Sequence, residues 1–297
     1  MCWTDRCDDP SGVTVVVRGT FKDCTNLTRV TIPETVTAID GHFWGGGAFD
    51  GCSQLTSIGI PKGVTVVASY AFRNCVKLAN VTIPDSVTVI GDHAFMDCAG
   101  LTNVTIGKSV ASIGEWAFKG CTSLTSVRIP HGVRVLENGT FRDCTSLTNA
   151  TIPDSVTSLW GWFWPGGAFQ GCSKLSSITI PPSVTSIGFQ SFAGCSSLTN
   201  VTIPNSVTNI DAWAFRDRTN LAQVLIGTGV TCFGEGTFWC DTSLASIHFL
   251  GNAPSVGARP FGGVNKATIY YQSGTVGWGP EFGGRPTVLW NPERQSK

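Results

Sequence analysis

The sequence predicts a repeat solenoid built mostly from β-structure, and two periodic features predict it. Cysteines recur every 23 residues from Cys52 to Cys144, and Cys172 and Cys195 repeat the step. A phenylalanine stands three residues before each of them, and these rings, from Phe21 to Phe238, are expected to form a buried column. Because a unit this short cannot bury its own apolar faces, stacked neighbours must complete one continuous core.

Each unit predicts two short strands followed by a turn. In "LTNVTIP", Leu101, Val104 and Ile106 take inward positions, so Asn103 and Thr105 face outward. The proline and the Asp or Asn after it suit the centre of a turn and end the strand. A second extended piece such as "SVTSIG" follows, and "xxAFxxC" closes the unit with a single helical turn or a tight turn.

The pattern LxxVxIPxxVxxIGxxAFxxC resembles the BspA-like (Treponema-type) leucine-rich repeats over about residues 12 to 250. The resemblance implies a right-handed leucine-rich-repeat solenoid with a parallel β-sheet on its concave face and single helical turns on its convex side. The ending "GNAPSVGARPFGGVNKATIYYQSGTVGWGPEFGGRPTVLW" also resembles that of bacterial surface proteins of this family. It implies non-enzymatic binding or adhesion and a secreted or cell-surface location, and it names no ligand.

Three segments are expected along the chain. Residues 1–11 form a degraded or truncated N-terminal edge, and residues 12–250 form about ten repeat units. Residues 251–297 form a β-rich C-terminal cap, with the strands "ATIYY" and "PTVLW" and the rings of Trp278, Phe282 and Trp290 covering the core. The insertions "GHFWGGGAF" and "WGWFWPGGAF", and Gly107 and Gly227, recur 120 residues apart, which indicates a duplicated five-unit block.

Composition excludes several classes of function. Twenty basic residues balance twenty acidic ones without a Lys/Arg cluster, which argues against a nucleic-acid partner. No apolar run approaches the ~20 residues of a membrane helix, so membrane insertion is not expected. The opening "MCWTDRCDDP" shows no signal peptide, so the sequence alone leaves the location unknown.

The cysteines are expected to be structural thiols. Eight of the twelve share one repeat slot, where neighbours at about 4.8 Å exceed the Cβ separation that a disulfide prefers. Arg218 and Asp241 replace cysteine in the ninth and tenth units, so the slot tolerates its loss. The four histidines fall in different slots, and no nucleophile elbow or phosphate loop is present. The sequence therefore predicts no enzyme, no metal site and no cofactor.

One candidate binding surface is the concave sheet, whose outward residues are short and polar. They could hydrogen-bond an extended peptide or glycan, although threonine and asparagine could also merely solubilise a β surface. The candidates are Asn80, Thr82, Asn103, Thr105, Ser126, Arg128, Asn149, Thr151, Asn200 and Thr202.

The other candidate surface is the pair of aromatic loops. An insertion between strands held in register must bulge outward, so some of its rings should stay partly exposed and mark an interaction site. Alternatively, the tryptophans fold back over adjacent turns. The candidates are His42, Phe43, Trp44, Trp160, Trp162, Phe163 and Trp164, with Trp116 and Trp213, and also Tyr70 and His93, in the equivalent slot of plain units.

These features predict a recognition or adhesion module for a protein or glycan partner. Self-association through the aromatic loops or the N-terminal edge is a further possibility. The competing interpretations are a structural spacer of a surface protein and an ice- or crystal-surface binder. A spacer would show no saturable binding, whereas an ice binder would shape ice crystals.

Overall fold

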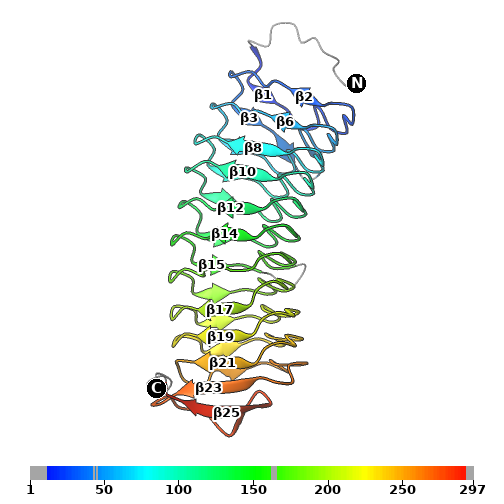
Figure 1. Cartoon of the computed structure of the whole chain (residues 1–297). Coiled ribbons are helices and arrows are strands. Elements are labelled where there is room, and N and C mark those ends of the chain that lie inside the picture. Colours follow the sequence, from blue (N-terminus) through cyan, green and yellow to red (C-terminus); the bar gives the residue numbers. More distant parts are fainter. Residues whose placement is uncertain (1–11, 43, 45, 162–165, 292–297) are drawn as a thin grey trace.

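The computed structural model describes residues 12–42, 44, 46–161 and 166–291, which stack as the coils of one solenoid (Figure 1). A typical coil adds a strand to a first sheet, a strand to a second sheet and a turn to a third side, although residues 175–180 form no first-sheet strand. The first sheet contains β2 (Arg29–Val30), β6 (Ser57–Ile58), β8 (Asn80–Ile83), β10 (Asn103–Ile106), β12 (Ser126–Arg128), β14 (Asn149–Thr151), β17 (Asn200–Ile203), β19 (Gln223–Ile226), β21 (Ser246–Phe249), β23 (Thr268–Gln272) and β25 (Arg285–Trp290), with β24 (Glu281–Phe282) antiparallel to β25.

The second sheet is made of two-residue strands. They are β1 (Val15–Val16), β3 (Ala38–Ile39), β7 (Val66–Val67), β9 (Val89–Ile90), β11 (Ser112–Ile113), β13 (Val135–Leu136), β15 (Ser158–Leu159), β16 (Ser186–Ile187), β18 (Asn209–Ile210), β20 (Cys232–Phe233) and β22 (Ser255–Val256). Its ladder is interrupted between β11 and β13, and that of the first sheet between β10 and β12 and again between β14 and β17.

Strand register follows the sequence period. Asn103 pairs with Asn80, one repeat away. Across the second insertion Ser158 still pairs with the equivalent Ser186, so the additional residues leave the register unchanged. The two ends of the first insertion, β4 (Gly41–His42) and β5 (Gly46–Gly47), pair as short antiparallel strands.

The third side consists of turns, and the predicted single helical turns are wrong. No α-helix occurs in the described ranges, and none of their segments could cross a membrane as a helix. In one coil Tyr70 and Asn74 both have positive φ angles of 63° and 59°, which interrupts a right-handed helix twice. The N–H of Cys75 donates within the turn to the Phe72 carbonyl, whereas the N–H of Phe72 donates to Ala94 of the next coil. Alternate amides therefore link neighbouring coils instead of continuing a helix.

The residue before the cysteine slot adopts the left-handed conformation in most coils. Aspartate, asparagine and glycine tolerate this conformation better than other residues, which explains the aspartate row that the sequence predicts to form turns. The aspartates with positive φ are Asp23, Asp97, Asp143 and Asp217.

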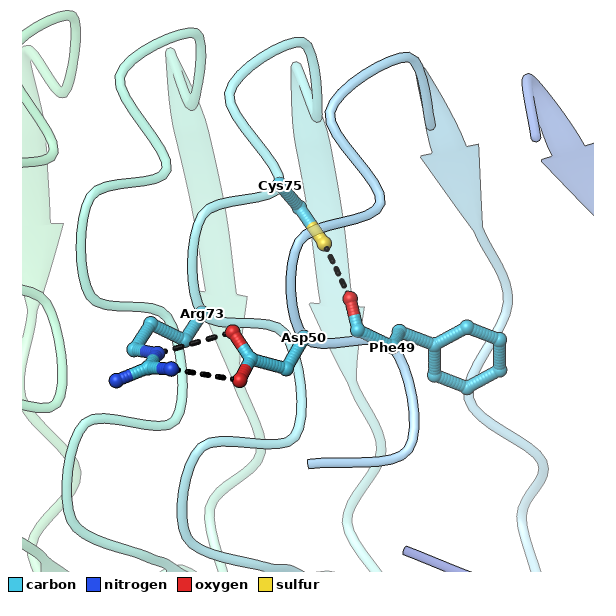
Figure 2. A network of polar contacts seen from close by, with 4 residues as sticks. All are labelled: Phe49, Asp50, Arg73 and Cys75. Carbon is cyan, nitrogen blue, oxygen red and sulfur yellow. Dashed lines mark hydrogen bonds and ion pairs between the residues drawn. The ribbon is translucent and has the colours of Figure 1, made fainter. Parts of the chain in front are cut away.

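The core contains the predicted phenylalanine column. Neighbouring rings lie nearly parallel, with centroids from 5.0 Å apart at Phe21–Phe49 to 5.9 Å at Phe238–Phe261. The cysteines of the repeat slot form a ladder along the axis, and each ladder thiol from Cys52 to Cys195 donates to the carbonyl of the phenylalanine in the preceding coil. The Cys75 thiol, for example, donates to the Phe49 carbonyl at 3.2 Å (Figure 2). Thiols and rings thus hold consecutive coils together.

An ion pair between buried Asp50 and partly exposed Arg73 lies beside this column (Figure 2). Asp50 is only 1% exposed and accepts hydrogen bonds from Arg73 Nε at 2.9 Å and Nη2 at 2.7 Å. The hydrogen bond to Asp50 raises the pKa of Arg73. Because both carboxylate oxygens are satisfied by a fork of donors, the charge is compensated despite its burial.

The solenoid geometry continues into the C-terminal residues. The predicted strands form β23 and β25, and Val264 takes the cysteine slot beside Phe261 in the core. Trp278 and Phe282 pack on Phe249, with ring centroids 4.8 and 5.6 Å away. Trp290 instead packs on His248, a residue of the outward row, so this ring does not join the others over the core.

Candidate recognition surfaces

The outer face of the first sheet carries all ten residues that the sequence assigns to it. Every one of them is exposed, because alternate side chains of each strand point away from the core. Pairing aligns Asn103 with Asn80 and Thr105 with Thr82. Two files of hydroxyl and amide groups therefore follow the solenoid axis, one strand spacing of about 4.8 Å between neighbours.

A basic hollow opens on this face where the first sheet is interrupted. It measures about 400 Å³ and lies between β10 and β12, with Lys108, Arg128 and His131 in its wall. Lys108 Nζ lies 3.4 Å from Asp85 Oδ2, and its backbone N–H donates to the same carboxylate and lowers the pKa of Asp85. Sequence reasoning found Arg128 and did not single out Lys108.

A second hollow, of about 610 Å³, lies on the same sheet near its C-terminal end. The rings of His248 and Tyr270 stack at 4.7 Å, and Trp290 meets His248 edge-on at 4.8 Å. Gln223 and Ser246 line the same hollow. Burial lowers the pKa of His248. Sequence reasoning missed this site, although His248 already broke the threonine file.

The aromatic loops are described only in part. His42 is exposed, Trp44 is 86% exposed, and the backbone N–H of Trp44 donates to His42 Nδ1 at 3.3 Å. Trp160 is 42% exposed. Phe43 and the candidates Trp162, Phe163 and Trp164 lie outside the described residues. At least one ring of each loop therefore reaches solvent.

The equivalent slot of the plain coils holds a row of stacked rings. Tyr70 lies 4.5 Å from His93, which meets Trp116 edge-on at 4.6 Å. Tyr70 is 6% exposed, so its predicted partial exposure is wrong: His93 covers it on one side and Arg73 lies 5.0 Å from its centre. His93 and Trp116 are partly exposed, and burial lowers the pKa of His93.

Trp213 forms a shorter row of the same kind. Its ring is partly exposed, lies 5.3 Å from Phe189 and is covered by the Arg216 guanidinium at 5.4 Å. A side chain at Gly236 would collide with this indole, as one at Gly139 would with Trp116. Glycine in the next coil thus leaves room for each tryptophan, and these rings pack along the turns.

The described side chains do not converge as catalytic groups would. No group of three or more His, Cys, Asp and Glu in this part of the chain could hold a metal ion. Burial raises the pKa values of Glu115 and Glu137 on the turn side. The surfaces with distinctive chemistry are therefore the outer face of the first sheet and the exposed loop rings.

Comparison with known proteins agrees with this architecture. A family model described as the BspA type leucine rich repeat region matches in six copies over residues 2–44, 44–162 and 165–279. The chain belongs to the BspA-type leucine-rich repeat family. The family is known for repeat architecture rather than for enzymatic chemistry. No curated protein matches the chain.

Several solved structures of leucine-rich repeat proteins are similar to this family member. A Bacteroides ovatus protein is 24% identical over 92% of this chain and 85% of its own, with a TM-score of 0.53, which shows the fold. A Treponema pallidum protein is 31% identical over 63% of this chain and 72% of its own, with a TM-score of 0.47. A Faecalibacterium prausnitzii leucine rich cell surface protein is 25% identical over 84% and 83%, with a TM-score of 0.39.

Proposed function

We propose that this chain is a non-enzymatic recognition module that holds an extended protein or glycan partner against the outer face of the first sheet. The observation that carries the proposal is the pair of exposed files from Asn80 to Asn200 and from Thr82 to Thr202. Short hydroxyl and amide side chains both donate and accept hydrogen bonds, and they lose little conformational entropy when a partner binds. We infer a secreted or cell-surface location from the family resemblance alone.

The two hollows support the same face as the binding surface. A flat polar sheet offers contact along its length, whereas a hollow can select a particular group of the partner. Arg128 in one hollow and His248 in the other occupy the file that holds threonine in β8, β10 and β17. An extended partner could therefore be fixed at two points and hydrogen-bonded between them.

A different row of threonines, each directly before a strand of the second sheet, argues against the ice-binding alternative. Thr88 Oγ1 donates to the Thr65 carbonyl at 3.2 Å, and Thr208 Oγ1 donates to Thr185 at 3.3 Å. Thr37, Thr157, Thr185 and Thr231 make the same bond to the coil before them. These hydroxyls already staple neighbouring coils, so they are less available to order water.

The test blocks the face without disturbing the fold. In the double variant Thr82→Arg and Thr202→Arg, two long cations stand in the file where Arg128 already occurs. The matched control is Val66→Arg with Ser112→Arg, which places the same charges at exposed positions of the second sheet. Binding to an array of immobilised extracellular proteins and glycans is measured for the parent and both variants.

We expect saturable binding by the parent, at least tenfold weakening in the first-sheet variant, about 1.4 kcal/mol, and no change in the control. Equal binding by the parent and the first-sheet variant would refute the assigned face. A complete lack of saturable binding by the parent would favour the spacer interpretation. Circular dichroism of all three chains establishes that the solenoid is intact.

A further inference from the structure

The C-terminal end of the first sheet departs from the polar pattern of its other strands. The outward file that carries Thr202 in β17 continues as Leu225 in β19, His248 in β21 and Tyr270 in β23. In the duplicated block His248 stands 120 residues after Arg128. Equivalent positions of the two blocks thus hold a cation, Arg128, in the first and an aromatic ring, His248, in the second.

These rings border a shallow, open hollow on the sheet face. His248 and Tyr270 come from neighbouring strands and stack with only 10° between their planes. Trp290 belongs to β25, beyond β23, yet its ring lies 4.8 Å from that of His248. The indole therefore reaches back across β23, and the hollow of about 610 Å³ has aromatic walls.

Polar groups inside the hollow have no partner in the described part of the chain. Ser246 is only 9% exposed, and its Oγ makes no hydrogen bond. The ring nitrogens His248 Nδ1 and Trp290 Nε1 are also buried without a hydrogen bond. Buried polar atoms in folded proteins are normally satisfied. These atoms lie just beneath the lining, and the exposed Gln223 amide is the polar group of the hollow that a ligand with several hydroxyl groups would meet first.

The hollow is also electrically neutral. Its described lining contains no Asp, Glu, Lys or Arg, in contrast to the basic hollow with Lys108 and Arg128. Burial lowers the pKa of His248, so its imidazole is uncharged at neutral pH. A charged ligand would lose hydration here without gaining a counter-charge, whereas a neutral one pays no such penalty.

We propose that this hollow binds a neutral sugar ring, whose C–H face packs on the aromatic walls while its hydroxyls meet the Gln223 amide. The volume suits such a ring, since ligand pockets of this kind measure roughly 300–1,000 Å³ and combine aromatic walls with a few polar groups. The inference rests on the proposed function, because it makes the hollow the end subsite for a glycan lying on the first sheet.

The experiment titrates the full chain with three neutral hexasaccharides, of β-1,3-linked glucose, of mannose and of xylose, and measures heat by calorimetry. At least one should bind with a dissociation constant at or below about 1 mM. The double variant His248→Thr and Tyr270→Thr should weaken that binding at least tenfold. It is expected to fold, because threonine is the residue that this file carries in other strands. Val66→Thr, at an exposed position of the second sheet outside the proposed binding face, should bind as the parent does.

The inference would be overturned by no heat with any of the three hexasaccharides up to about 10 mM, far above the ~1 mM expected, or by unchanged binding of the double variant. Equal loss in Val66→Thr would also overturn it, because the effect of the double variant would then not be specific to the hollow. These failures are separable from failure of the proposed function, which the variants at Thr82 and Thr202 test with immobilised partners.

Discussion

Replacing Arg218 and Asp241 together with cysteine should stabilise the solenoid, although replacing either one alone should destabilise it. Both side chains are fully buried in the slot that holds a thiol in the preceding coils. Arg218 Nε donates to the Phe215 carbonyl at 2.9 Å, and its backbone N–H donates to Asp241 Oδ1 at 2.7 Å. Both terminal nitrogens of Arg218 and Oδ2 of Asp241 make no hydrogen bond in the described part of the chain. This pair is therefore desolvated without being fully hydrogen-bonded.

The size of the effect follows from that imbalance. Removing one partner leaves an uncompensated buried charge, which costs about 3–5 kcal/mol, whereas exchanging a buried pair for packed small groups gains about 1–4 kcal/mol. The void left by the guanidinium subtracts about 24 cal/mol per Å³, so we expect a net gain near the lower end, about 1 kcal/mol. The two changes are thus strongly non-additive.

The effect should also depend on pH. Burial raises the pKa of Asp241 from 3.8 to about 7, so the folded chain holds this proton more tightly than the unfolded chain. The stability contributed by this group is present at low pH and is lost as pH rises from about 4 to about 7. The double variant lacks this loss, so its advantage over the parent should be larger at pH 8 than at pH 5.

Urea unfolding followed by circular dichroism, with a reductant present, measures all four chains at both pH values. The expected order at pH 8 is double variant, parent, then the two single variants. A double variant less stable than the parent would refute the reasoning. So would an Asp241→Cys chain as stable as the parent, because the remaining Arg218 would then not be an uncompensated charge.

Three further changes have expected outcomes. Gly120→Ala should lower the thermal midpoint more than Gly194→Ala: both have φ near 70°, but only at 120 would the added methyl overlap the aspartate of the coil before. Alkylation at neutral pH should label Cys232 and Cys240, which are partly exposed, while the ladder thiols, which are buried, should react only after unfolding; four or more ladder disulfides would contradict this. Asp50→Asn should cost about 1–3 kcal/mol of unfolding free energy by weakening a charged, two-donor contact, and an unchanged unfolding curve would contradict it.

Most of the fold could be predicted because one period sets everything along the axis. Once Cys75 and Cys98 are equivalent, so are Asn80 and Asn103, and register, inward rows and the phenylalanine column follow. The conformation of the turns could not be predicted in this way. Their apolar spacing fits a turn of helix, and only the φ angles of residues such as Tyr70 show that the amides alternate between coils.

The candidate site was predictable in its rows and not in its hollows. Exposure of the files follows from strand alternation, which is a local rule. The aromatic hollow depends on Trp290 reaching across a strand to His248, and nothing in the local sequence relates residues 42 positions apart outside the repeat period. The basic hollow likewise lies where the first sheet is interrupted, between β10 and β12.

A duplicated five-unit block, as the 120-residue offset predicts, would give the two hollows a common origin, although their chemistry differs. Asn103 and Ser126 in the first correspond to Gln223 and Ser246 in the second, so the amide and hydroxyl at the floor are kept as residue types. The file beside them changes from Thr105 and a cation to Leu225 and an imidazole, which alters charge without altering strand geometry. A solenoid that keeps its backbone constant can in this way carry different specificities along one face. If both hollows serve one partner, the chain that binds here should present a hydroxyl-rich ring at one end and an acidic group about five coils, roughly 24 Å, away.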